Sequence, residues 1–288
     1  MWIAGFASLL ILLALGGRAE AGSDTSLTLA RSLAASDDHA QAALEFRRLA
    51  LNTADRSEQG TYYWMAGYEY GKAGRFDQAE KMMDQAEDAA PAMETEIYLL
   101  RGENNRRRGR PREAAFYLES LVSSNKPATV RSAAARQLTA VRLQTRDFAG
   151  ARQALSTAPV PSEKGMAAIE AYEKGRDKSP TVGGLLGLIP GLGYAYSGEY
   201  ANASRSLILN ALCIWGIASF AEDEVWGGVA VVGFAEITFY TGSVYGGADA
   251  AFRYNRDRLE SSTRLIEERA GFRPDLSALP LLNLRFEF

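Results

Sequence analysis

Two polar residues inside otherwise apolar stretches are the first candidates for chemistry. Glu236 is the one charged residue between positions 225 and 248, and Asn210 lies in the uncharged segment 206–221. A carboxyl group inside a long apolar helix is costly, so it marks a candidate functional site. Counted from Asp223, Asn210 lies 13 residues back and Glu236 lies 13 residues forward. We therefore expect the two side chains to hydrogen-bond in an antiparallel hairpin, with Thr238 or Tyr240 nearby. The pair either locks the two helices together or belongs to a proton or ion pathway.

The residue types on which most enzymes and metal sites depend are scarce in this sequence. It has one cysteine, Cys213, and one histidine, His39, which excludes an internal disulfide framework, a CxxC site and most histidine-based catalysis. No nucleophile with a base, no paired carboxylates and no set of metal ligands stands out. The sequence therefore predicts no catalytic residues, no metal and no cofactor, and the chain is not expected to be an enzyme. The net charge of -3, with acidic and basic residues mixed, also disfavours nucleic acid as a partner.

A sequence pattern recurs in the first half of the chain. GYEYGKAGRFDQAEKMMDQAEDAAP, from Gly67, returns 35 residues later as GENNRRRGRPREAAFYLESLVSSNKP, from Gly102, and looser copies displaced by 37 surround Ala42 and Ala151. The pattern resembles the tetratricopeptide repeat, a pair of antiparallel helices of about 34 residues. The positions that carry the match are Gly67, Tyr70, Gly74, Ala79, Ala86 and Pro91. This resemblance implies an all-α helical solenoid of about four helix pairs over residues 24–157.

The resemblance also implies a binding surface, because solenoids of this family bind peptides or protein segments along the concave face formed by the first helix of each pair. The family positions fall on Trp64, Tyr68, Lys72, Leu99, Glu103, Arg106, Arg107 and Arg136. Aromatic side chains beside arginines suit an extended segment with acidic groups or a free carboxylate. Two alternatives stay open. Trp64 and Tyr68 could pack between neighbouring repeats, and the basic run 106–112 could be a solvated helix end.

The composition changes after a predicted linker helix within 158–179. Residues 180–197 and 206–221 carry no charge, and a bilayer core of about 30 Å is crossed by roughly 20 apolar helical residues. The short acidic turn 222–224 between long apolar runs indicates a helical hairpin. We expect a small membrane helical bundle over 180–250 and a polar tail over 251–288. The alternative is a glycine-rich core buried in a soluble domain.

The segment PTVGGLLGLIPGLGYAYSGEY, residues 180–200, combines apolar and helix-breaking residues. It lacks the phosphate-loop and dinucleotide-binding patterns. Gly183, Gly187 and Gly191 recur every four residues, which lets another helix pack closely, while Pro190 predicts a bent or re-entrant segment whose freed backbone groups need partners. The segment also resembles the opening of small TM2-type membrane domains, which implies a membrane module without an activity. That match is carried by Lys178, Gly191, Gly193, Tyr196 and Gly198.

The N-terminus predicts the compartment. Residues 1–21 have the apolar run and the Ala19-Glu20-Ala21 site of a secretory signal peptide, with an uncleaved anchor as the alternative. We therefore expect a bacterial cell-envelope protein of the inner membrane, with the repeats in the periplasm. The charges around the hairpin place its acidic turn outside. If the repeats are periplasmic, segment 180–197 must then cross as well, which gives three spans and a cytoplasmic tail. Lys174, Arg176 and Lys178 instead favour a cytoplasmic flank, as an uncleaved anchor with cytoplasmic repeats or a re-entrant first segment would allow.

The last ten residues, LPLLNLRFEF, alternate apolar side chains with the period of a strand. They resemble the closing strand of outer-membrane barrel proteins, but the rest of the sequence lacks the alternating ten-residue segments of a barrel. We therefore expect a strand added to a partner's sheet, or simple packing, with the outer-membrane interpretation as the alternative. Taken together, the sequence predicts a membrane-tethered scaffold at the cell envelope, in envelope assembly or export. Its expected partners are a protein or peptide segment in the solenoid groove, membrane lipid and other envelope membrane proteins. The alternative function is a small transport or channel component centred on Glu236, with the repeats as a regulatory domain.

Overall fold

The computed structural model describes residues 25–160 and 162–267, and all regular secondary structure in these ranges is helical. The all-α fold class is therefore confirmed. The chain divides into two compact units. Among the described residues, the first unit holds 25–160, 162–166 and 266–267, and the second holds 167–265. The expected signal peptide, 1–21, and the final strand-like segment lie outside the described residues.

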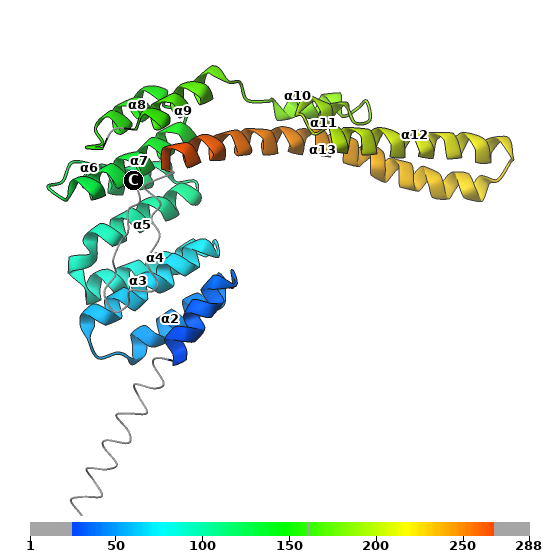
Figure 1. Cartoon of the computed structure of the whole chain (residues 1–288). Helices are drawn as coiled ribbons and strands as arrows, with labels where there is room; N and C mark the ends of the chain where they lie inside the picture. The colour runs from blue at the N-terminus through cyan, green and yellow to red at the C-terminus, as the bar shows by residue number, and fades with distance from the viewer. Residues whose placement is uncertain (1–24, 161, 268–288) are drawn as a thin grey trace, which may run out of the picture. The chain divides into compact units, whose positions relative to one another are not determined.

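The first unit is a succession of antiparallel helix pairs, in which each helix packs against the next (Figure 1). The first pair joins the helical residues 25–35 to α2 (His39–Asn52). The other pairs are α3 (Arg56–Lys72) with α4 (Phe76–Ala89), α5 (Glu94–Arg107) with α6 (Pro111–Val122), and α7 (Ala128–Gln144) with α8 (Phe148–Ser156). A short 3₁₀ turn, η1 (Pro91–Met93), leads into α5.

The turn inside each pair repeats the same backbone geometry. Asp37, Gly74, Gly109 and Arg146 have φ angles between 60° and 77°, and they stand 37, 35 and 37 residues apart. The N–H of the next residue in each turn donates to the carbonyl five residues earlier, as in Arg75 to Tyr70 at 2.8 Å. This bond closes the helix end in a Schellman motif, for which glycine is the favoured residue. The repeat seen in the sequence is therefore also a repeat of the backbone.

Small residues set the distance between the two helices of a pair. A Cβ atom added to Gly67 would lie 2.1 Å from Met83 Cε, and one added to Gly102 would lie 2.7 Å from Leu118 Cδ2. The two pairs of positions are both 16 residues apart, so the same crossing recurs in successive repeats. Buried side chains that include Phe46, Trp64 and Leu118 fill the space between the helices.

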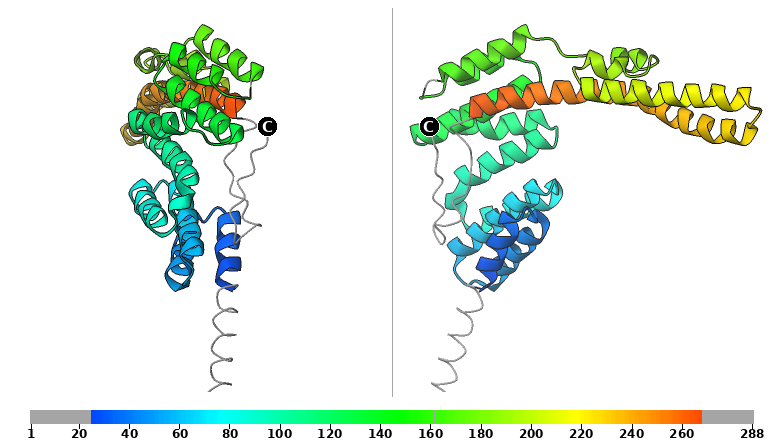
Figure 2. Two further views of the ribbon diagram at one scale, coloured as in Figure 1. Left: turned by 90° about the vertical axis from the view of Figure 1, so that its left-hand side faces the viewer. Right: turned by 45° about the vertical axis from the view of Figure 1, so that its right-hand side comes forward.

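The second unit is dominated by a long helical hairpin. α12 (Tyr200–Glu222) and α13 (Trp226–Glu267) run side by side, joined by a turn in which Glu224 has a φ of 61° (Figures 1 and 2). Both helices are long and apolar enough to cross a membrane, and only 6% of the most apolar window of each is buried. α13 continues without a break past residue 250, where we expected a polar tail to begin.

The glycine-rich segment forms two short helices instead of one long helix. α10 (Pro180–Leu186) and α11 (Leu192–Tyr196) have seven and five residues, which at 1.5 Å per residue span about 11 and 8 Å. Neither can cross a bilayer core of about 30 Å. Around the break, Ser243 of α13 accepts a hydrogen bond from Gly191 N at 3.1 Å and donates one to Gly187 O at 2.9 Å. Tyr240 donates a hydrogen bond to Leu188 O. Side chains of α13 therefore hydrogen-bond to several backbone groups that have no helical partner at the break.

Candidate functional site

The expected peptide-binding residues of the first unit separate into two groups. Trp64, Leu99 and Arg136 are buried, with at most 5% of each residue exposed. Trp64 stacks on Tyr68, with ring centroids 5.9 Å apart, and Lys72 lies over the outer part of this stack, 5.7 Å from the Tyr68 ring. Trp64 and Arg136 are thus not exposed in this structure, and their part in partner binding stays a prediction. The structure favours the alternative in which Trp64 packs between repeats.

The remaining members of the group stay at the surface of α3 and α5. Glu103 and Arg106 form a two-point ion pair with both N···O distances at 2.9 Å. Arg107 is exposed along its side chain but donates a hydrogen bond to Gly71 O of α3 at 3.0 Å. Together with Tyr68 and Lys72, these residues form a polar surface that we call the α3–α5 face.

The basic run 106–112 is partly used within the unit itself. Besides the bonds of Arg106 and Arg107, Arg108 forms an ion pair with Asp77 at 2.6 Å, and the Arg107 guanidinium lies 5.8 Å from the Phe76 ring. These contacts tie the end of α5 to α4. They support the interpretation of the run as a helix end rather than a free basic patch.

The expected hydrogen bond between Asn210 and Glu236 is not formed. Asn210 Nδ2 donates to Ser206 O of its own helix at 2.7 Å, while the Glu236 carboxyl interacts with the thiol of Cys213. The cause is the register of the hairpin. Val232 lies opposite Gly216, and counting six residues outward on both helices places Asn210 opposite Thr238 rather than Glu236. The turn is centred on Glu224, one residue beyond the expected Asp223, and this displaces the pairing by two residues.

The hairpin nevertheless contains buried polar atoms that lack partners. Within the described residues, Ser206 Oγ, Asn210 Oδ1 and Glu236 Oε2 are buried and make no hydrogen bond. Asn210 is only 1% exposed. Ser206, Asn210 and Cys213 follow one another at spacings of four and three residues, so they share one face of α12. A polar stripe therefore runs along the hairpin.

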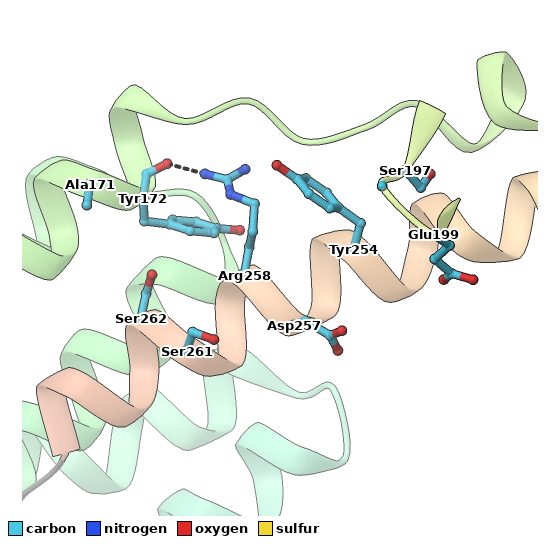
Figure 3. A pocket seen from close by; sticks show the side chains of 10 residues that line it. Ala171, Tyr172, Ser197, Glu199, Tyr254, Asp257, Arg258, Ser261 and Ser262 are labelled. Carbon is cyan, nitrogen blue, oxygen red and sulfur yellow. Dashed lines mark hydrogen bonds between the residues drawn. The ribbon is translucent and has the colours of Figure 1, made fainter. Parts of the chain in front are cut away.

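A polar cavity of about 420 Å³ lies at the open end of the hairpin, where α12 begins. One face of α13 forms its floor (Figure 3), through the residues Tyr254, Asp257, Arg258, Ser261 and Ser262. Ala171 and Tyr172 of α9 (Glu163–Lys174) and the turn 197–199 line the other sides. The volume is within the range of about 300–1,000 Å³ that is typical of small-molecule sites.

Arg258 is held rigidly in this cavity. Its guanidinium donates to Asp177 Oδ1 at 2.6 Å. It also donates to Tyr172 O at 2.8 Å and lies 4.8 Å from the centroid of the Tyr172 ring (Figure 3). Beside it, the Lys178 ammonium lies 4.7 Å from the Tyr196 ring and 5.5 Å from the Tyr254 ring. Cation–π contacts of this kind fix both cations next to aromatic rings.

Carboxylates at the same end of the hairpin balance these cations. Arg253 donates to both carboxylate oxygens of Glu199 at 2.8 Å and also pairs with Asp249. The hydrogen bond from Arg253 holds the pKa of Glu199 below its usual value, despite the opposing effect of burial. Asp257 is exposed on the cavity rim.

Sequence reasoning missed this cavity. The pattern that could have indicated it is the spacing of Tyr254, Asp257, Arg258, Ser261 and Ser262, which places five polar or aromatic residues on one helical face. The prediction of a polar tail from residue 251 does not take this helical spacing into account. No protein-family model, no curated protein and no solved structure matches this chain. A function is therefore inferred from the geometry within each unit.

Proposed function

We propose that the chain is a membrane-tethered scaffold of the bacterial cell envelope, in which the first unit is a tetratricopeptide-type solenoid that binds a protein or peptide segment. One observation carries this proposal: a unit of repeated helix pairs with a buried core is followed along the chain by a hairpin whose apolar side chains are exposed. Large side chains such as Trp215, Phe234 and Ile237 are 66–75% exposed. A soluble core helix would bury such residues, whereas lipid solvates them.

The solenoid assignment is supported by the repeated turn geometry and by the close helix crossings at Gly67 and Gly102. The α3–α5 face is the proposed contact surface, because Tyr68 offers an aromatic anchor beside Lys72 and Arg107. An acidic segment or a free carboxylate of a partner protein complements these groups. The proposed setting is an envelope-assembly or export complex in the inner membrane, with the first unit in the periplasm.

Photocrosslinking tests the contact surface directly. A photoreactive residue at position 72, in the full chain expressed in its membrane, is expected to crosslink one defined protein partner. The matched control is position 81 on α4, which replaces another exposed lysine. Lys72→Glu is expected to weaken the crosslink from a photoreactive residue at position 68 at least tenfold, and Lys81→Glu is expected to leave it unchanged. Equal crosslinking from positions 72 and 81 would contradict the proposed surface.

The polar stripe of the hairpin favours a second candidate function, a transport or channel component centred on Glu236. Ser206, Asn210 and Glu236 each leave a buried oxygen without a hydrogen bond, which is costly in lipid unless water, an ion or another helix supplies a partner. Proton flux into vesicles that contain the full chain tests this candidate. Glu236→Leu is expected to abolish flux, and Glu236→Gln is expected to abolish it as well because an amide does not carry the proton. Flux that persists in Glu236→Gln excludes a proton pathway through this residue.

A further inference from the structure

The cavity at the open end of the hairpin is built around a preorganised arginine. Two of the five N–H donors of Arg258 bond to Asp177 and to Tyr172 O, so the guanidinium is held at two points and three donors are left unused within the described residues. Gly175 leaves space for this arrangement, since a Cβ there would lie 2.3 Å from Arg258 Nη2. A fixed guanidinium with unused donors is well suited to bind a phosphate group through paired hydrogen bonds.

A second, independent feature also points to a ligand. Ser197 lines the cavity, is only 6% exposed, and its Oγ makes no hydrogen bond within the described part of the chain. A buried hydroxyl without a partner costs free energy unless a bound molecule or water completes it. Ser261 and Ser262 offer further hydroxyl groups on the cavity floor.

The charged residues that line the cavity indicate that the ligand carries a positive group as well as a phosphate. Asp257 and Glu199 also line the cavity, so a ligand with only negative charge would meet repulsion there. Arg253 already neutralises Glu199 through two hydrogen bonds, whereas Asp257 is 70% exposed at the rim and its contact with the Arg256 guanidinium is long, at 3.8 Å. A ligand with a phosphate and an ammonium group a few bonds apart matches this distribution.

The position of the cavity along the hairpin identifies the source of such a ligand. On α13 the cavity begins at Tyr254, two residues after the exposed apolar side chain of Phe252. On the other helix of the hairpin, the cavity ends where α12 begins. This is the level at which lipid headgroups meet an apolar span. Resting on the proposed membrane attachment, we propose that the cavity binds the phosphoethanolamine headgroup of a phospholipid. The phosphate lies at Arg258, and the ammonium lies at Asp257.

Native mass spectrometry of the full chain in detergent tests this inference. With added phosphatidylethanolamine, phosphatidylglycerol or phosphatidylcholine, the wild-type chain is expected to retain phosphatidylethanolamine most tightly. Arg258→Gln is expected to weaken that binding about tenfold, the size of one lost charge-assisted hydrogen bond. Arg264→Gln is the matched control, because it removes the same charge from an exposed side chain of α13 that does not line the cavity. Soluble glycerophosphoethanolamine, added as a competitor, distinguishes a lipid from a free headgroup as the ligand.

A second variant keeps the test independent of folding. Asp257→Asn removes an exposed carboxylate and is expected to reduce the preference for phosphatidylethanolamine over phosphatidylglycerol about tenfold without changing the melting temperature. Equal losses in Arg258→Gln and Arg264→Gln, or equal binding of all three lipids by the wild type, would overturn the headgroup site while leaving membrane attachment intact. If the chain is instead monodisperse without detergent, both the headgroup site and the proposed function fail.

Discussion

At the scale of single residues, the turn glycines contribute through backbone conformation alone. Gly109 has a φ of 77°, and a Cβ added there would meet no atom within 4 Å. Gly109→Ala is therefore expected to destabilise the first unit by about 1 kcal/mol, because the left-handed conformation strains any residue with a Cβ. Gly109→Asn should cost roughly half as much, since asparagine tolerates this region. Chemical denaturation measures both, and equal stability of all three proteins would show that the turn does not constrain the unit.

Arg101 is the residue whose loss should disturb the first unit most through charge. From α5 it donates hydrogen bonds to Glu80, Asp84 and Glu87 of α4 at 2.6–2.7 Å, and its side chain is only 7% exposed. Burial lowers the pKa of Arg101, but the bonds to Glu87 and Glu80 outweigh burial and raise it overall. Arg101→Met therefore leaves three carboxylates that repel one another.

We expect Arg101→Met to cost about 2 kcal/mol. This is less than the roughly 3–5 kcal/mol of a fully buried pair, because the three carboxylates are 38–62% exposed and water can solvate them. Urea denaturation in low and high salt checks the size and the mechanism, since salt should reduce the loss. Arg48→Met, in an exposed pair with Glu45, serves as the control and should cost below about 1 kcal/mol. A loss no larger than the control's would contradict this account of Arg101.

At the scale of elements, the sequence is sufficient to predict the repeated helix pairs, but it is not sufficient to predict the register of the hairpin. Gly67 and Gly102 recur because the two helices cross closely there. Gly74 and Gly109 recur because the turn needs a positive φ angle. Both features could therefore be predicted from the sequence. Burial was harder to predict. Trp64 occupies a family surface position, but its ring stacks inside the unit. The Asn210–Glu236 pairing failed because hairpin register depends on one turn residue, Glu224, that spacing alone does not identify.

The break between α10 and α11 depends on a side chain of another element. Ser243→Ala removes the acceptor for Gly191 N and the donor to Gly187 O. Each orphaned buried backbone group costs about 1–3 kcal/mol, so we expect the second unit to lose roughly 2–4 kcal/mol. Unfolding in mixed detergent micelles measures this loss. The control is Thr238→Val, whose hydroxyl bonds only to Phe234 O of its own helix and should matter little. Equal effects of the two substitutions would show that Ser243 does not support the break.

The ion pair at the open end of the hairpin should make stability depend on pH. Because the pKa of Glu199 is lowered in the folded protein, its contribution is present above the usual glutamate pKa near 4.5 and is lost as the pH falls through the lower folded value. The melting temperature of the full chain in detergent should therefore fall between pH 5 and pH 3. Glu199→Gln should lower the melting temperature at pH 7 and reduce this dependence. An identical pH profile in the two proteins would exclude Glu199 as the titrating group.

At the scale of the whole molecule, the lengths of the helices limit how the chain can cross a membrane. α10 and α11 are too short to span, and α12 and α13 are the two candidate spans among the described residues. A chain that crosses twice returns to the side from which it started. The segments before α12 and after the apolar part of α13 are therefore expected on the same side, with the turn 222–224 on the other side. Three spans, which the sequence allowed, would place the two flanks on opposite sides.

Cysteine accessibility in intact cells tests this topology. In a Cys213→Ser background, single cysteines at Ser156, Asp223 and Glu260 are labelled by an impermeant maleimide before and after membrane permeabilisation. Positions 156 and 260 should respond alike, and position 223 should respond in the opposite way. Labelling of 156 and 260 in intact cells agrees with the periplasmic side proposed for the first unit; labelling of 223 alone agrees instead with the basic residues that flank the hairpin, which favour the cytoplasm. Opposite responses at 156 and 260 would mean that another segment crosses, and the re-entrant role of α10 and α11 would be wrong.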